Sequence, residues 1–235
     1  MADIMTLVPG HGAPRVSASL QPLDDALVPV DRRLVVQDAP DSRSAAQYRV
    51  RRHRITAAGD PRVLVVTSAV AREGKSTCAA NLALAMSEDG RERVLLLEAN
   101  RRAPSLARLF GIKPSSCFAR QMERHHAARL TAWSMVEVCS GLHVAAMVPP
   151  APSERLHLDG AAFAEALTAL RRTSYQHLII DAPPVLGSAD VNLIEQLSDA
   201  VLFTVLRTKT SGARLARAID QLRPTRLLGM ALLDT

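Results

Sequence analysis

The feature that most constrains this chain is a short polar loop, AVAREGKST at 69–77, which lies between two apolar runs. The run before it, RVLVVTS at 62–68, is rich in β-branched residues and predicts a strand buried on both faces. The run that continues from it, 76–90, is apolar around most of its circumference and ends at Gly90, which predicts a buried helix. A strand, a loop containing Gly-Lys-Ser and a helix, in that order, are typical of the phosphate-binding loop, here with Ala69 in place of the first glycine.

The backbone of such a loop supplies an anion site. Its N–H groups and those at the start of the next helix point at one spot, where the helix dipole favours negative charge. Lys75 is expected to reach the β- and γ-phosphates, the Ser76 hydroxyl to ligate Mg²⁺, and Thr77 to bond the α-phosphate. The alternative is a chance match in an ordinary turn. The candidate nucleotide contacts are Ala71, Arg72, Glu73, Gly74, Lys75, Ser76 and Thr77.

Two acidic residues end apolar runs that we expect to be buried strands. Asp181 ends the run HLIID, and Glu98 closes the run RVLLLE. A phosphate-binding loop needs an acidic group on a neighbouring strand to complete the Mg²⁺ shell. The metal candidates are therefore Ser76, Glu98 and Asp181, and the catalytic candidates are Lys75, Glu98 and Asp181.

Each acidic residue also has an ordinary structural interpretation. Asp181 could cap a following turn, and Glu98 could form a surface ion pair with Arg101 or Arg102. The sequence also bears on which nucleotide base is bound, because the chain has no Asn-Lys-x-Asp motif for recognising guanine. ATP is therefore the favoured nucleotide.

Beyond these motifs, apolar runs predict an alternation of strands and helices. Strands are expected at 93–99, 177–183, 200–206 and 226–233, with one or two edge strands at 135–140 and 142–147. Helices are expected near 160–174, 189–198 and 211–222. Buried strands that alternate with helices indicate an α/β fold, with a mostly parallel sheet flanked by helices on both faces.

The N-terminal part of the chain has a different composition. Residues 1–43 contain five prolines and no clear period, which predicts a disordered or extended leader. Residues 44–58 predict an arginine-rich helix, with Ser42 or Ser44 as its N-cap. We therefore divide the chain into a leader, 1–43, and an ATPase-like domain, 44–235.

Composition narrows the class of protein further. The 235 residues include three cysteines without a C-x-x-C pair, which argues against a disulfide framework or a zinc ribbon. Aromatic residues make up 3% of the chain, so despite the net charge of +6 we expect no stable nucleic-acid binding. No apolar run approaches the ~18 residues of a spanning helix and no secretory signal is present. The expected location is the cytoplasm.

Taken in order, the motifs resemble those of the bacterial tyrosine kinases of polysaccharide synthesis and export, a branch of the MinD/ParA-like ATPases. The first motif is TSAVAREGKST at 67–77, the second is EANRRAP at 98–104, and the third is the D-x-P-P that ends LIIDAPP at 178–184. Upstream, AQYRVRR at 46–52 is similar to the Tyr-Arg helix of that family. The resemblance implies Mg-ATP bound by the phosphate loop, and it covers residues from about 40 to 235.

Carried over by position, the resemblance also shows where this chain departs from the family. Glu98 and Asn100 fall on the two Asp positions of the second motif, so one carboxylate is longer and the other is missing. Arg49 and Arg52 fit the oligomer-forming motif E-x-x-R-x-x-R, whose Glu is replaced by Ala46. The family's C-terminal tyrosine cluster is also missing, since the chain has only two tyrosines and ends at Thr235. Losing one base or charge can reduce a rate by about 10²–10⁴.

Three functions remain open. The first is an ATP-dependent protein-tyrosine kinase of exopolysaccharide or capsule synthesis, with activity reduced by the altered second motif. The second is a catalytically weak or inactive ATP-binding regulatory subunit of a membrane polysaccharide co-polymerase, which Asn100 favours. The third is a ParA-like partitioning ATPase, although Val70 replaces the lysine that the wider group carries early in its loop.

The resemblance also implies partners. We expect contact with the cytosolic segment of a membrane polysaccharide co-polymerase, which would bring the protein to the inner membrane as a peripheral subunit. A homo-oligomer formed through the helix of Arg49 and Arg52 is a further expectation.

Overall fold

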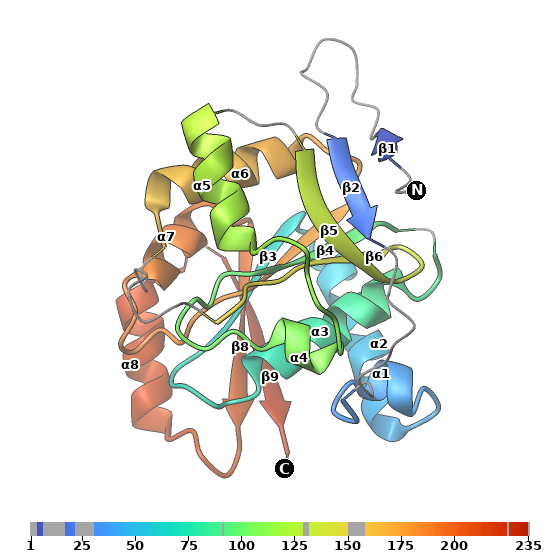
Figure 1. The fold of residues 1–235 in the computed structure, drawn as a ribbon. Coiled ribbons are helices and arrows are strands. Elements are labelled where there is room, and N and C mark those ends of the chain that lie inside the picture. The colour runs from blue at the N-terminus through green and yellow to red at the C-terminus, as the bar shows by residue number, and fades with distance from the viewer. Residues whose placement is uncertain are drawn as a thin grey trace.

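The computed structural model describes residues 4–6, 17–21, 31–90, 92–128, 132–149, 158–224 and 226–234. These residues form one sheet of nine strands with helices on both faces (Figure 1). The pairings β1–β2 and β5–β6 are antiparallel and the others are parallel. In spatial order the strands are β1 (Ile4–Thr6), β2 (Ser17–Gln21), β5 (Ala132–Cys139), β6 (Leu142–Ala145), β4 (Val94–Glu98), β7 (His177–Asp181), β3 (Val63–Ser68), β8 (Ala200–Leu206) and β9 (Leu227–Leu233).

The helices divide between two layers because successive side chains of a strand point to opposite faces. In β3, Val63 and Val65 pack in one core cluster, whereas Leu64 and Val66 pack in the other. The first cluster is covered by α5 (Phe118–Ala128), α6 (Gly160–Arg171), α7 (Asp190–Gln196) and α8 (Gly212–Leu222). The second is covered by α1 (Val35–Asp38), α2 (Arg43–Ala57), α3 (Lys75–Ser87) and α4 (Leu106–Leu109). The expected α/β fold is confirmed.

Helix starts follow side-chain caps that the sequence signals. Ser42 caps α2 by accepting a hydrogen bond from the Ala45 N–H, and Asp159 and Ser211 cap α6 and α8 in the same way. Helix α3 has no such side chain at its start. It begins directly after Gly74, so its first N–H groups are left facing the loop.

One placement within the sheet differs from the sequence analysis. The two runs expected to be edge strands, 135–140 and 142–147, form β5 and β6 inside the sheet. They are interior because β2, from the N-terminal stretch, pairs with β5 in parallel. The described edges are instead β1 and β9.

The packed part of the chain also begins before residue 44. Leu34 and Val36 are buried in the α2–α3 core cluster, and the Asp31 N–H donates to the Leu109 carbonyl. Residues 31–43, assigned above to the leader, therefore pack with the domain. The remaining described residues of that stretch are the two strands β1 and β2, and the rest lies outside the described residues. Within the described ranges, no helix is long and apolar enough to cross a membrane.

Candidate functional site

The phosphate-binding loop joins β3 to α3 and is held in an unusual backbone conformation. Gly74 has φ +75° and Arg72 has φ +63°, both in the left-handed region. A Cβ atom on residue 74 would lie 2.6 Å from Leu233 Cδ1 at the end of β9, so both conformation and space favour glycine. Lys75 opens α3 with a side chain that is 7% exposed, and Ser76 is partly exposed beside it. The loop therefore presents the amides and hydroxyls that the sequence predicted for a phosphate.

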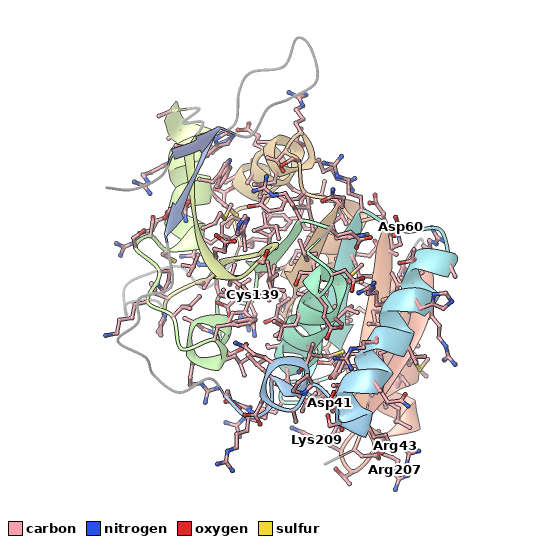
Figure 2. All side chains as sticks on the ribbon, turned by 90° about the vertical axis from the view of Figure 1, so that its right-hand side faces the viewer. Asp41, Arg43, Asp60, Cys139, Arg207 and Lys209 are labelled. Carbon is pink, nitrogen blue, oxygen red and sulfur yellow. The ribbon has the colours of Figure 1, made fainter. Side chains whose placement is uncertain are left out.

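Glu73 lies in this loop, but its side chain turns inward. The carboxylate is fully buried, accepts the Val70 N–H at 2.9 Å, and accepts the Thr210 hydroxyl. A second tie comes from Lys209, whose Nζ donates to the Ala71 carbonyl at 2.8 Å. Figure 2 shows Lys209 near the foot of the molecule. Glu73 therefore shapes the loop from behind and offers a phosphate only its backbone.

Sequence reasoning missed Lys209 and Thr210, which fix the loop from the β8–α8 connection. One signal for Lys209 was available: the chain has only three lysines among 29 basic residues. A lysine in such a chain stands out even where no motif surrounds it. Thr210 had no comparable signal, because its role depends on a contact 137 residues away along the chain.

The two acidic strand ends lie side by side. Glu98 and Asp181 are paired in register on the neighbouring parallel strands β4 and β7. Alternation along each strand turns both side chains toward the α3 face, because Leu96 and Ile179, two residues earlier, pack in the α3 cluster. The structure therefore brings together the two carboxylates that the sequence predicted.

Asp181 is completely buried, and neither carboxylate oxygen has a hydrogen-bond partner among the described residues. Burial raises its pKa above the ordinary value, while the Lys75 ammonium and the Ser76 hydroxyl nearby act to lower it. The alternative role as a cap for a turn is ruled out, because no described backbone N–H reaches this carboxylate. A buried, unpartnered carboxylate beside Ser76 fits the oxygen ligands that Mg²⁺ requires.

Glu98 has the opposite environment. Its Oε1 accepts the N–H groups of Ser105 and Leu106, at 2.5 and 2.9 Å, and its Oε2 accepts that of Met147 at 2.8 Å. Burial and the neighbouring Asp181 raise the pKa of Glu98 to about 7, although the three amide bonds oppose the shift. The suggested surface ion pair does not form, because Glu98 is buried and Arg101 pairs with Glu123.

The loop after β4 continues along the wall of a large cavity. Asn100, at the second carboxylate position of the motif, donates to the Ala103 carbonyl at 3.1 Å. The cavity measures about 1360 Å³ and extends over the phosphate loop. Its other walls come from α2, from residues 183–188 after β7, and from the end of β9. Each motif of the sequence analysis contributes residues to this lining, although Glu98 and Asp181 themselves are not among them.

The arginines of the proposed oligomer motif are engaged within the chain. Arg49 forms a bidentate ion pair with Glu88, and Arg52 donates to Asp89 and to the Ala85 carbonyl. Both contacts tie α2 to the C-terminal end of α3. In this conformation the two side chains stabilise the fold of one chain, and their use between chains stays a prediction.

Both tyrosines of the sequence are buried. Tyr48 is 6% exposed under the guanidinium of Arg51, and Tyr175 is 1% exposed with its hydroxyl 2.5 Å from His143 Nδ1. Burial raises the pKa of each phenol well above its ordinary value. Neither hydroxyl is presented to solvent as a phosphate acceptor.

Comparison with known proteins agrees with this geometry. A family model for ParA, described as NUBPL iron-transfer P-loop NTPase, matches residues 61–228. Tyrosine-protein kinase YwqD of Bacillus subtilis (strain 168) is 27% identical over 205 residues, covering 85% of this chain and 85% of YwqD. The BceF tyrosine kinase domain superposes with a TM-score of 0.66 at 26% identity, covering 86% of this chain and 81% of that domain.

A second curated relative is longer. The succinoglycan biosynthesis transport protein ExoP of Rhizobium meliloti (strain 1021) is 25% identical over 212 residues, covering 86% of this chain but 26% of ExoP. This chain is therefore similar to one part of a longer polysaccharide transport protein. Because the matched model spans the phosphate loop and both acidic strand ends, the chain belongs to the ParA family of P-loop NTPases, and two of the proteins that it resembles are named tyrosine kinases.

Proposed function

We propose that this protein is an ATP-dependent protein-tyrosine kinase of the machinery that synthesises and exports extracellular polysaccharide. One observation carries the proposal: the buried carboxylate of Asp181, which has no hydrogen-bond partner among the described residues, lies beside the Lys75 and Ser76 side chains of a phosphate-binding loop. Such a carboxylate costs free energy unless a cation compensates it. Loop, lysine and carboxylate together suit the β- and γ-phosphates of ATP.

Within this site each residue has one role. The loop amides and Lys75 hold the β- and γ-phosphates, and Thr77 contacts the α-phosphate. Ser76 and Asp181 would hold Mg²⁺, which when bound neutralises charge on the transferred group. Glu98, whose oxygens already accept three amides, orders the loops after β4 and β6 and places the motif residues that follow it. We therefore treat Glu98 as a positioning residue.

The reaction itself needs little covalent participation by the protein. The acceptor tyrosine oxygen forms a bond to the γ-phosphorus, while the bond from that phosphorus to the bridging oxygen of ADP breaks. The phenolic proton passes to water, and ADP leaves. Positioning and neutralisation of charge account for most of the catalysis of such a transfer.

The phosphate acceptor lies outside these 235 residues or on a partner. Both internal tyrosines are buried, so phosphorylating either would require local unfolding. The relation to ExoP, a transport protein of succinoglycan biosynthesis, supports a polysaccharide setting. We propose that the partner is the cytosolic segment of a membrane polysaccharide co-polymerase, which would keep the protein at the inner membrane.

The hydrogen bonds and residue types of the second motif favour one alternative function, that of a regulatory subunit. Glu98 already accepts three backbone amides, and Asn100 cannot carry charge. Of the acidic candidates, Asp181 alone has no hydrogen-bond partner among the described residues. A protein with that motif could bind Mg-ATP tightly and transfer phosphate slowly or not at all. It would then act as a nucleotide-gated regulatory subunit of the same co-polymerase.

Two measurements separate these functions. Calorimetry of Mg-ATP binding to the wild-type protein and to Lys75→Ala tests the site, and we expect binding that the variant loses. Incubation with γ-labelled ATP, with and without the cytosolic segment of the co-polymerase, tests the transfer. Label on tyrosine that disappears in Lys75→Ala supports the kinase, whereas binding without transfer supports the regulator. Failure of a well-folded protein to bind Mg-ATP would exclude both.

A further inference from the structure

The cavity over the phosphate loop is larger than a nucleotide alone requires. Its volume of about 1360 Å³ exceeds the roughly 300–1,000 Å³ that is usual for small-molecule sites. Beyond the loop, it continues between α2 and the end of β9 on one side and the segments that follow β4 and β7 on the other. The site therefore has room for a second group beside a bound triphosphate.

Arginines from several segments of the chain line this extension. Arg51 comes from α2, Arg72 from the phosphate loop, Arg102 from the segment after β4, and Arg108 from α4. A fifth, Arg33, also lines the cavity but is paired with Asp31. None of the other four arginines forms an ion pair with another residue that the structure describes. The extension therefore carries a concentrated positive charge.

Two of these guanidinium groups are held in place by the fold. Arg51 lies over the Tyr48 ring, 5.0 Å from its centroid, and donates to the Leu232 carbonyl at 3.3 Å. Arg102 donates to the Gly187 carbonyl at 3.3 Å. Both bonds use carbonyl acceptors, which orient a guanidinium without cancelling its charge. Arginine also offers several donors in one plane, so each group keeps donors for a carboxylate.

A bound nucleotide does not neutralise this charge. Mg-ATP carries about two net negative charges at neutral pH, and an ionised Asp181 adds one more. Lys75 and Arg72 lie in the loop that would hold the phosphates, and they offset most of that charge. Asp234, the acidic residue of the outer lining, pairs with Arg207. Arg51, Arg102 and Arg108 thus remain as a surplus in the same cavity as the phosphate-binding loop.

We propose that this arginine-lined extension binds an acidic polypeptide segment, in which Asp and Glu flank the acceptor tyrosine. The inference rests on the proposed kinase function and names its substrate class. An acceptor must enter from outside, because both tyrosines of this chain are buried. The carboxylates of the segment pair with the surplus arginines and hold the phenol at the open end of the triphosphate.

The test measures peptide binding and needs no turnover. Fluorescence anisotropy would follow three labelled peptides, with tyrosine flanked on each side by three Glu, three Gln or three Lys residues. Each is titrated with the full chain, with and without magnesium and a non-hydrolysable ATP analogue. We expect the Glu peptide to bind at least about tenfold more tightly than the Gln peptide, and the difference to shrink with added salt.

Variants locate the site. The double variant Arg51→Gln/Arg108→Gln should remove most of the preference for the Glu peptide. The matched control, Arg214→Gln/Arg217→Gln, changes net charge equally on the exposed face of α8 and should keep that preference. Circular dichroism melting of both variants checks that the fold is intact. If Arg51→Gln/Arg108→Gln is unstable, Arg108→Gln alone, at an exposed position, answers the same question.

The outcomes separate this inference from the proposed function. Equal affinity for the Glu and Gln peptides, or equal loss in both double variants, overturns the acidic-segment site. So does an unchanged peptide preference with a tenfold loss of analogue binding in Arg51→Gln/Arg108→Gln, which would assign these arginines to the nucleotide. A single-stranded oligonucleotide that displaces the Glu peptide at equal charge also overturns it. Peptide binding that depends on the arginines but leads to no phosphate transfer would support the acidic-segment site and exclude the proposed kinase function.

Discussion

The ends of β4 and β7 carry two carboxylates in the same register but in opposite states. Glu98 accepts hydrogen bonds from three backbone amides, and Asp181 accepts none from the described residues. Both are buried and both have raised pKa values. The difference teaches that a carboxylate at the edge of such a sheet can serve the protein's own loops or can be kept for a ligand. Sequence position alone does not distinguish the two.

The largest effect is expected from Asp181→Asn. We expect phosphate transfer to fall by about 10²–10⁴, because the amide cannot supply the negative oxygen that a cation requires. Stability without nucleotide should not fall, since the change removes an unpartnered buried charge. Initial rates with labelled ATP and a thermal melt of the same sample check both parts. If Asp181→Asn lost stability but kept its rate of phosphate transfer, the roles assigned to Asp181 and Glu98 would be wrong.

Glu98→Ala should have the reverse signature. The change leaves the N–H groups of Ser105, Leu106 and Met147 without their acceptor, so we expect the free energy of unfolding to fall by about 3 kcal/mol or more. Urea denaturation measures the loss, and Glu98→Gln, which keeps one acceptor oxygen, should lose less. Full stability of Glu98→Ala would show that the three bonds do not hold the loops.

The raised pKa of Glu98 makes stability depend on pH. Because the folded value, about 7, lies above the ordinary value near 4.5, the folded state binds more protons than the unfolded state between those values. The stabilising contribution is fully present below pH 4.5 and is lost as the pH rises through 7. The expected loss is up to about 3 kcal/mol. Denaturation midpoints of wild type and Glu98→Gln across pH 5–8 test it, and equal slopes would contradict it.

Thr210→Val should have a small effect on the fold and a specific effect on the loop. It removes the hydroxyl that donates to Glu73, so we expect a loss of about 1–2 kcal/mol in stability and weaker Mg-ATP binding. Calorimetry on Thr210→Val and on Thr210→Ser, which keeps the hydroxyl, measures the effect. Unaltered Mg-ATP affinity in Thr210→Val would show that the β8–α8 connection does not determine the conformation of the phosphate-binding loop.

The sequence was a good guide wherever chemistry is local. The strand at 62–68 and the helix that follows it were predicted, and Ser42, which caps α2, was one of two serines predicted for that role. β-branched runs, apolar helix faces and capping residues all act over a few positions. Edge strands were predicted less well. Run 142–147 lies inside the sheet because β6 is placed between β4 and β5. Run 135–140 lies inside it because β2, a segment more than a hundred residues earlier, pairs with β5.

For the candidate site, residue types at fixed spacing sufficed to name Gly74, Lys75, Ser76 and Asp181 as neighbours. A strand, a tight loop and a helix leave those groups at one edge of a parallel sheet. Whether a carboxylate there is free or already satisfied was decided by the tertiary structure. The amides that occupy Glu98 and the threonine that holds Glu73 come from distant parts of the chain, and no local pattern encodes which distant donor reaches a buried oxygen.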